Sequence, residues 1–166
     1  MSGTHILEVG DTAPDFELRG THDGDRDTYR LGDYTDAGQW VFLMFYTFDF
    51  NPICTAGMCA VRDAEFFDLY EDLVPLGVSG DGIHSHEQFA AQHEINYPLL
   101  SDTGKDVAEQ YGVVREEYEG MRRVHQRAVF VVDDTRTVRF AIVVDADSPE
   151  DIDLSPINDV LQGLLG

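Results

Sequence analysis

The chain has 166 residues, of which 43% are hydrophobic, and these values predict one compact domain over residues 1–166 and exclude an intrinsically disordered protein. Eleven basic against 32 acidic residues give a formal net charge of −21, which argues against nucleic acid and anionic membranes as partners. No segment approaches the roughly 20 consecutive apolar residues that a membrane-spanning helix needs.

The first half of the chain predicts a hairpin, a buried strand and a helix, in that order. The polar stretch 20–27 (GTHDGDRD) is rich in Gly and Asp and indicates a turn between two short strands. The apolar run 40–46 (WVFLMFY) is too short for a typical helix and predicts a buried central strand. Pro52 suits the first position of a helix capped by Asn51, and apolar spacing extends that helix to about Leu73.

The second half alternates further strands and helices. In chain order the pattern predicts a strand at 76–78, a helix capped by Ser85, a short strand at 99–100, a helix from Asp102 or Thr103 to Tyr111, strands at 128–132 and 138–144 joined by a polar turn, and a last helix capped by Asp153 or Ser155. Early β-α-β units give parallel strands, and the late hairpin adds antiparallel ones. We therefore expect an α/β fold with a thioredoxin-like mixed central sheet, helices on both faces and an N-terminal β-hairpin extension.

Cys54 follows the predicted central strand and lies about three residues into the helix after it. Unpaired backbone N–H groups and the positive end of the helix dipole favour a thiolate at this position. Cysteines at helix N-termini have pKa values well below the free value of about 8.5. A thiolate attacks the O–O bond of a peroxide and becomes a sulfenic acid, so Cys54 is the candidate nucleophile. The alternative is an inert cysteine buried at a strand–helix junction.

Cys59 makes the nucleophilic interpretation stronger, because a sulfenic acid that meets no thiol is overoxidised. Five residues along an intact helix turn the two side chains about 140° apart and separate their Cα atoms by about 8–9 Å. A disulfide tolerates about 7 Å at most, so the bond needs the first helical turns to unwind. Gly57 lies between the cysteines and weakens the helix there. We therefore predict redox-linked unwinding of about residues 52–62.

Other uses of the cysteines and histidines are disfavoured by spacing. The chain has no C-x-x-C pair, and two cysteines alone do not make a tetrahedral zinc site. Of six histidines only His84 and His86 form a close pair, which at a helix start is more often exposed or capping than metal-binding. No histidine belongs to a motif that would supply the base of a Cys–His hydrolase. We therefore expect no metal site.

Seven segments carry a resemblance to one family, in that family's order and over nearly the whole chain. They are VGDTAPDFEL (9–18), FYTFDFNPICT (45–55), Arg62-Asp63, SHEQF (85–89), YPLLSD (97–102), VAEQYGV (107–113) and QRAVFVVDD (126–134). Together they resemble the peroxiredoxins, above all the bacterioferritin-comigratory-protein or Q-type branch, in which the two reactive cysteines are five residues apart. The resemblance implies reduction of hydrogen peroxide and organic hydroperoxides, no metal or organic cofactor, recycling by thioredoxin or a similar dithiol donor, and a monomer or homodimer.

The resemblance also assigns roles to residues. Cys54 matches the peroxidatic cysteine and Cys59 the resolving cysteine, which implies an internal Cys54–Cys59 disulfide. Arg127 matches the arginine that precedes a late strand, and its fixed positive charge would stabilise the thiolate and polarise the peroxide. The alternative for Arg127 is a surface arginine in a basic cluster with Arg122 and Arg123.

Three positions depart from the family pattern P-x-x-x-(T/S)-x-x-C. Thr47 occupies the proline position, Asn51 the hydroxyl position, and Gly57 the position of an acid three residues after the cysteine. The amide of Asn51 both caps a helix and can donate a hydrogen bond, so we hypothesise that it replaces the hydroxyl at the peroxide. These departures concern the rate and the peroxide preference, and they leave the two-cysteine chemistry in place.

Other functions fit parts of the same pattern. A non-enzymatic redox sensor or peroxide relay would use the same cysteine switch to engage a partner. A general thioredoxin-like reductase is disfavoured because the C-x-x-C motif is missing. A holdase chaperone role, which some peroxiredoxins show, has no support in the sequence.

The charged residues also predict a source and a compartment. Lys105 is the only lysine, and the other ten basic residues are arginines. An acidic excess with almost no lysine is typical of salt-saturated cytoplasms, where the Debye length of about 3 Å at 1 M screens the repulsion. We therefore expect a halophilic source, the alternative being an acidic mesophilic protein. Residues 1–15 lack a basic start and an apolar core, so we expect no secretory signal and a cytoplasmic location.

Overall fold

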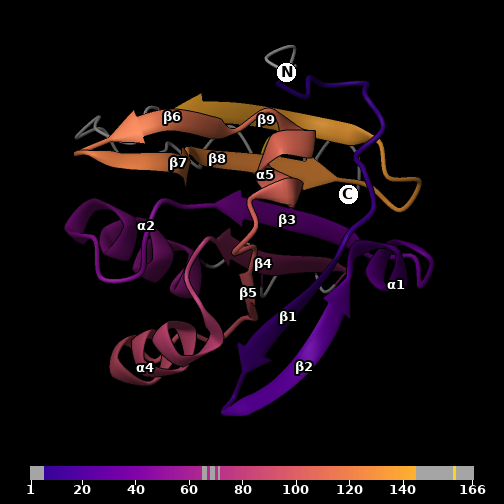
Figure 1. Ribbon diagram of the computed structural model, residues 1–166. Helices are drawn as coiled ribbons and strands as arrows, with labels where there is room; N and C mark the ends of the chain where they lie inside the picture. The colour runs from indigo at the N-terminus through magenta and orange to yellow at the C-terminus, as the bar shows by residue number, and fades with distance from the viewer. Residues whose placement is uncertain (1–5, 65–66, 68–69, 71, 145–158, 160–166) are drawn as a thin grey trace.

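Strands and short helices alternate along the chain and assemble around one central sheet (Figure 1). The computed structural model describes residues 6–64, 67, 70, 72–144 and 159. The elements are β1 (Glu17–His22), β2 (Asp25–Arg30), α1 (Leu31–Thr35), β3 (Trp40–Phe45), α2 (Pro52–Arg62), β4 (Leu73–Ser79), α4 (Ile83–His93), β5 (Leu99–Ser101), α5 (Asp106–Tyr111), β6 (Val114–Tyr118), β7 (Met121–His125), β8 (Arg127–Val132) and β9 (Val138–Val144).

The central sheet has seven strands in the order β2-β1-β5-β4-β3-β8-β9. The inner pairs β3–β4 and β4–β5 are parallel, whereas β1–β2, β1–β5, β3–β8 and β8–β9 are antiparallel. The N-terminal hairpin therefore joins the sheet through β1, and β6–β7 form a separate two-stranded sheet. The expected mixed sheet with a parallel centre and a late antiparallel hairpin is confirmed.

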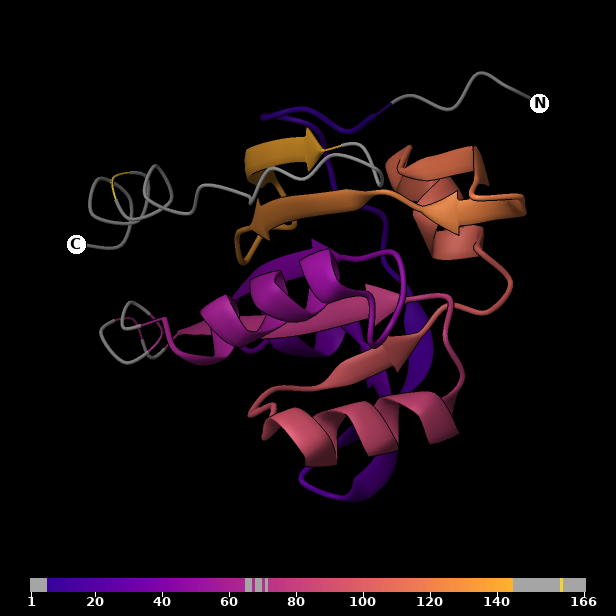
Figure 2. The same cartoon turned by 90° about the vertical axis from the view of Figure 1, so that its left-hand side faces the viewer.

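The β3 strand separates two apolar layers, and all six of its residues are buried. Its alternate side chains point to opposite faces, so Leu43 and Phe45 pack in one cluster with Tyr111 of α5. Phe42 and Met44 belong to the other cluster, on the face covered by α2 and α4. Figure 2 shows both of these helices turned towards the viewer. Burial on both faces explains why the sequence of this strand is a continuous apolar run.

The prediction of one helix from Pro52 to about Leu73 is wrong. Helix α2 ends at Arg62, with Asp63 as its C-cap, and Leu73 is the first residue of β4. The parallel register pairs Trp40 with Leu73 and continues along both strands, so β4 is longer than the predicted 76–78. The apolar spacing could not separate these elements because the strand and the helix bury side chains in the same cluster.

The predicted turn at 20–27 is much shorter in the structure. Only Asp23 and Gly24 separate β1 from β2, and both have positive φ angles, 52° and 81°. Two central residues with positive φ match the right-handed twist of paired strands, which makes this a tight hairpin turn. The polar residues on either side of it are strand residues.

Two predicted helix starts are shifted. Ser85 lies inside α4, whose N-cap is Gly82 with no side-chain bond, and its hydroxyl donates to Asp49 instead. The α5 helix begins at Asp106 rather than at Asp102 or Thr103. Asp102 still serves the helix start, because its carboxylate accepts from the N–H groups of two residues in the first turn of α5.

The β6–β7 hairpin and the five-residue helix α1 were not predicted. Half of the residues in β6 and β7 are charged, and the strands are joined by Glu119 and Gly120, which have positive φ angles. The predicted last helix, capped by Asp153 or Ser155, lies outside the described residues. No helix in the part of the chain that the structure describes is long and apolar enough to cross a membrane.

Candidate active site

Cys54 is the third residue of α2 and is buried, with 4% of its surface exposed. Asn51 is the N-cap of this helix, as the sequence predicts. Its Oδ1 accepts hydrogen bonds from the backbone N–H of Ile53 at 3.0 Å and of Cys54 at 3.2 Å. The thiol thus lies in the first turn of a capped helix, where the dipole favours a negative charge.

Cys59 lies on the same continuous helix and is half-buried, and both thiols are free. The reduced protein therefore holds the two cysteines in the helical arrangement that the five-residue spacing predicts. Because an intact helix keeps their Cα atoms too far apart for a disulfide, this conformation cannot close the bond.

Two hydrogen bonds hold the end of α2. The hydroxyl of Tyr97 donates to the carbonyl of Met58 at 2.8 Å, and the guanidinium of Arg62 donates to the carbonyl of His93 at 2.6 Å. These bonds connect the end of α2 to His93, the last residue of α4, and to Tyr97, which lies between α4 and β5. The Asn51 cap holds the start of the helix, and these bonds hold its end, so unwinding of about residues 52–62 stays a prediction.

Arg127 is the first residue of β8 and is only 4% exposed, so the alternative of a surface arginine is wrong. The pair Phe45–Ala128 places the start of β8 beside the end of β3, from which the chain runs to α2. Side chains alternate along a strand, so Arg127 shares a face with Val129, which packs in the cluster of Cys54. Strand pairing therefore places Arg127 at the α2 end and on the α2 face of the sheet.

Thr47 follows β3 and is buried, and its hydroxyl donates to the carbonyl of His125 at 3.0 Å. His125 ends β7, two residues before Arg127, and its Nε2 lies 2.9 Å from Oδ2 of the buried Asp102. A proline could not make the bond that Thr47 makes. This departure from the family pattern therefore links the loop before α2 to the strand that leads into Arg127.

Tyr118 was missed by the sequence reasoning, and no motif marks it. It ends β6, is 7% exposed and packs with Val124 and Phe48. The Nδ2 of Asn51 donates to its hydroxyl at 3.2 Å. The hydrogen bond to Glu119 and then burial raise the pKa of Tyr118, and the charge of Cys54 acts in the same direction. Tyr118 therefore bonds directly to the N-cap of the helix that carries Cys54.

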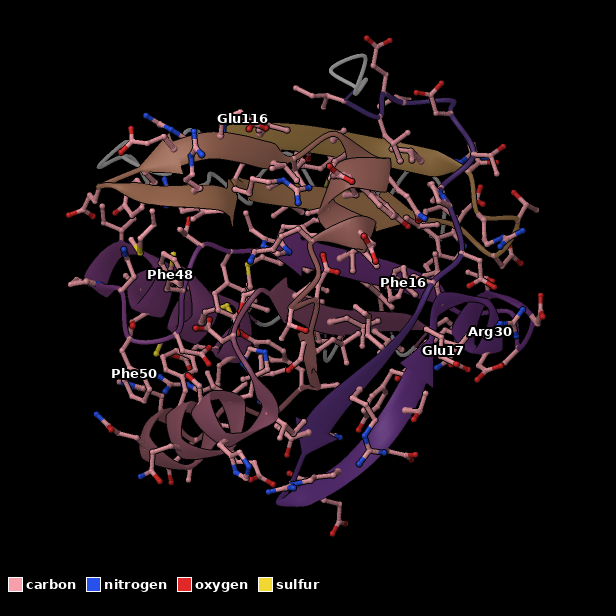
Figure 3. All side chains as sticks on the ribbon, in the orientation of Figure 1. Phe16, Glu17, Arg30, Phe48, Phe50 and Glu116 are labelled. Carbon is pink, nitrogen blue, oxygen red and sulfur yellow. The ribbon has the colours of Figure 1, made fainter. Side chains whose placement is uncertain are left out.

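Phe50 precedes the N-cap and has a φ of 69°, which is strained for a bulky residue. Its ring is 44% exposed and lies edge-on to Phe89 of α4, with centroids 5.2 Å apart, and near His93. Figure 3 shows the labelled Phe50 between α2 and α4, and Phe48 beside α2. The ring contacts hold the strained residue that turns the chain into Asn51.

The expectation of an exposed or capping histidine pair is wrong for His86. His84 is exposed, but His86 is fully buried, with Nδ1 2.7 Å from Asp49 Oδ2 and Nε2 3.0 Å from the Leu100 carbonyl. Asp49 belongs to the loop between β3 and α2. The histidine thus ties that loop to α4 and β5, a long-range contact that its spacing to His84 did not reveal.

Asp49, Asp81 and His86 have potential ligand atoms within 4.8 Å of one another, the type of group that can hold a metal. Both carboxylates already accept hydrogen bonds from the protein. Asp49 accepts from the hydroxyl of Tyr46, and Asp81 accepts from the hydroxyl of Ser79 and from the backbone N–H of Asp49. Burial, then the charge of Asp49, raises the pKa of Asp81. We interpret the cluster as a structural network that fixes the loop before α2.

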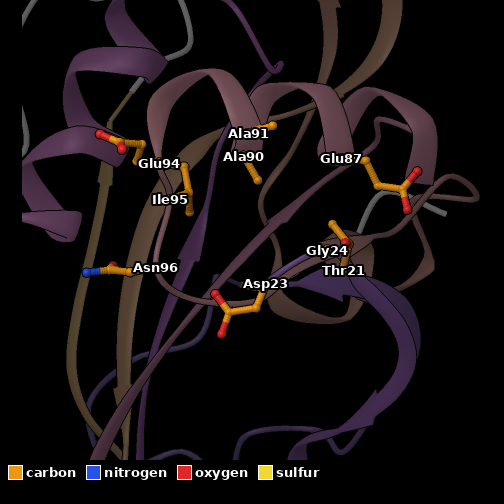
Figure 4. Close-up of a pocket in the computed structure, with 9 residues that line it drawn as sticks. All are labelled: Thr21, Asp23, Gly24, Glu87, Ala90, Ala91, Glu94, Ile95 and Asn96. Carbon is orange, nitrogen blue, oxygen red and sulfur yellow. The ribbon is translucent and has the colours of Figure 1, made fainter.

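A groove of about 450 Å³ lies between the β1–β2 turn and α4 (Figure 4). Its lining is partly acidic, with Asp23, Glu87 and Glu94, and includes no cysteine, histidine or basic residue. Glu87 is already paired with Arg26 at 2.7 Å. The groove therefore offers no nucleophile and is not part of the site around Cys54.

Comparisons with known proteins agree on one family. The sequence model of the AhpC/TSA family matches residues 9–141. Peroxiredoxin Bcp of Bacillus subtilis is 34% identical over 133 residues, which are 76% of this chain and 79% of that protein. A putative peroxiredoxin in the rubredoxin operon of Clostridium pasteurianum is 33% identical over 156 residues, 87% of this chain and 83% of its own. The crystal structure of peroxidoxin BcpB from Mycobacterium tuberculosis superposes with a TM-score of 0.79 at 29% identity, covering 96% of this chain and 99% of that one, which confirms the thioredoxin-like fold.

Proposed function

Because this chain belongs to the AhpC/TSA family and is a peroxiredoxin, we propose that it reduces hydrogen peroxide and organic hydroperoxides through Cys54 and Cys59. One observation carries this proposal: Cys54 is the buried third residue of a capped helix, with Arg127 buried on the same face of the sheet. A helix N-terminus and a guanidinium both favour a thiolate and the negative oxygen that leaves it.

In the first step the Cys54 thiolate attacks one oxygen of the peroxide and the O–O bond breaks. The attacked oxygen and its hydrogen stay on sulfur as a sulfenic acid, and the other oxygen leaves as hydroxide or alkoxide and takes a proton from water. Arg127 stabilises the thiolate and the developing negative charge. Asn51 uses one amide hydrogen on Tyr118, which leaves its second hydrogen to donate to the peroxide.

In the second step the first turn of α2 unwinds and the Cys59 thiol attacks the sulfenic sulfur. A Cys54–Cys59 disulfide forms and the hydroxyl leaves as water. A thioredoxin-like dithiol then reduces this disulfide to two thiols and is itself oxidised to a disulfide. No metal or organic cofactor takes part in this cycle.

Steady-state peroxide consumption tests the proposal directly. The wild-type protein is supplied with thioredoxin, thioredoxin reductase and NADPH, and NADPH oxidation is followed after peroxide is added. We expect many turnovers per protein and an internal disulfide when thioredoxin is left out. One turnover without recycling would instead support a redox sensor, which uses the same cysteines to signal to a partner.

Gly57→Ala is expected to slow disulfide formation by about 2- to 5-fold. A Cβ at Gly57 meets no atom within 4 Å, so alanine fits and stabilises the helix by about 0.4–1 kcal/mol. The unwound state becomes rarer by the same free energy. The measurement is acid-quenched mass spectrometry after one equivalent of peroxide.

Gly82→Ala is the matched control for this variant, because Gly82 also has open space around it but precedes α4 instead of lying in α2. We expect the control to close the disulfide at the wild-type rate. Equal rates for Gly57→Ala and the wild type would show that unwinding around Gly57 does not limit closure.

We also propose a halophilic source, a cytoplasmic location and a monomeric or homodimeric state. The charge of −21 with a single lysine supports the first, and a chain with only two cysteines, which carries no structural disulfide framework, suits the second. We expect the free energy of unfolding to rise steeply between about 0.1 and 3 M KCl, because salt screens carboxylate repulsion. Urea unfolding measures it, with sucrose at equal osmolality as control. Full stability at the lowest salt would point to an ordinary acidic protein.

A further inference from the structure

The amide of Asn51 is fixed in one orientation, because hydrogen-bond donors lie next to its Oδ1 and an acceptor lies next to its Nδ2. Its Oδ1 accepts from the N–H groups of Ile53 and Cys54, both of which are donors only. A flipped amide would turn its NH₂ group against these two donors. The NH₂ group must therefore face the other way, where the Tyr118 oxygen lies 3.2 Å from Nδ2.

Tyr118 is held from outside α2, by the β6–β7 hairpin. Its ring packs with Val124 of β7 and with Phe48 of the loop before α2. The same hairpin is tied to that loop by the hydrogen bond from Thr47 to His125. The hydroxyl of Tyr118 is therefore held by groups outside α2, whereas Asn51 belongs to the helix start.

We propose that Tyr118 is a positioning residue, which holds Asn51 and the first turn of α2 in the conformation that attacks peroxide. Tyr118 must release Asn51 before Cys54 can reach Cys59. The inference rests on the proposed function. The Asn51–Tyr118 hydrogen bond exists while the helix start is folded and is lost when it unwinds. Tyr118 thus favours the first chemical step and opposes the second.

Tyr118→Phe tests this role because it removes only the hydroxyl. We expect sulfenic acid formation at Cys54 to slow by about 2- to 5-fold, since Asn51 loses the partner that aims its second N–H. We expect closure of the Cys54–Cys59 disulfide to accelerate by about 2- to 10-fold, since the folded first turn loses one hydrogen bond. Rapid-quench mass spectrometry follows both steps after one equivalent of hydrogen peroxide.

Tyr111→Phe is the matched control. Tyr111 is also buried, but its hydroxyl donates to the carbonyl of Pro14, and its ring packs on the face of the central sheet opposite the Cys54 cluster. This variant is expected to lose stability and to keep both rates within about twofold of the wild type. A merely structural role of Tyr118 would lower stability in the same way and would not move the two rates in opposite directions.

Asn51→Ser provides the second arm, because serine keeps a capping oxygen and lacks the amide that reaches Tyr118. In this background Tyr118→Phe is expected to change neither rate further. The inference is overturned if either rate in Tyr118→Phe fails to move in its expected direction, or if the effect persists with Asn51→Ser. If the wild type itself forms no sulfenic acid or disulfide, the proposed function fails, which is a separate result.

Discussion

Cys54→Ser is expected to abolish peroxide consumption, with a loss on the order of 10³-fold or more, as for other enzymes that lose their nucleophile. The helix start and Arg127 favour a thiolate at this position, but a serine hydroxyl stays protonated at neutral pH even with this help. Oxygen and sulfur differ little in size at a site that is 4% exposed, so the fold is expected to persist. Consumption of hydrogen peroxide with excess small-molecule dithiol measures the effect.

The unfolding curve of Cys54→Ser is the control, since a loss of activity together with a loss of fold would say nothing about chemistry. A folded Cys54→Ser protein that still consumes peroxide at the wild-type rate would exclude Cys54 as the nucleophile. Mass spectrometry after peroxide treatment then shows whether Cys59 carries the oxygen instead.

Local sequence signals predicted the elements that place Cys54. The apolar run 40–46 became β3, and Asn51 with Pro52 begins α2 because a capping side chain and a proline act on their immediate neighbours. The polar turn 133–137 likewise joins β8 to β9. These signals depend on residues a few positions apart, so one sequence contains them in full.

Long-range contacts were beyond the same reasoning. Tyr118 meets Asn51 across 67 positions, and His86 meets Asp49 across 37. Tyr118 belongs to the β6–β7 hairpin, whose exposed residues are mainly charged. Its two strands therefore lack the apolar pattern from which a strand is predicted. The sequence located the candidate nucleophile and its cap, whereas the groups that hold the cap and its loop depend on tertiary packing.

The structure gives one explanation for the departures from the family pattern at Thr47 and Asn51. Thr47 bonds to β7 at His125, and Asn51 bonds to β6 at Tyr118, so both replacements reach the same hairpin. A proline could not donate the first bond, and the single O–H of a threonine or serine could not serve both Tyr118 and a peroxide. The loop before Cys54 is thus fastened to the β6–β7 hairpin by two of the three residues that depart from the family pattern.

Cys59→Ser is expected to keep the first turnover and to lose thioredoxin-dependent cycling. The first step needs only Cys54 and the groups around it, and Cys59 lies later on the helix, half-buried. Without Cys59 the sulfenic acid has no internal thiol to attack it, so no disulfide forms for thioredoxin to reduce. One equivalent of peroxide should add one oxygen to Cys54, and excess peroxide should drive it on to the sulfinic acid.

A small-molecule dithiol separates this mechanism from its alternatives, because it reaches a sulfenic acid directly. It should restore peroxide consumption by Cys59→Ser, whereas thioredoxin should not. Full thioredoxin-dependent turnover in this variant would mean that the reductant attacks Cys54 itself and that the helix need not unwind. Loss of even the first turnover would mean that Cys59 supports the reactivity of Cys54 in the folded helix. The reductant comparison therefore decides whether Cys59 acts after the first step, as the intact α2 helix implies, or within it.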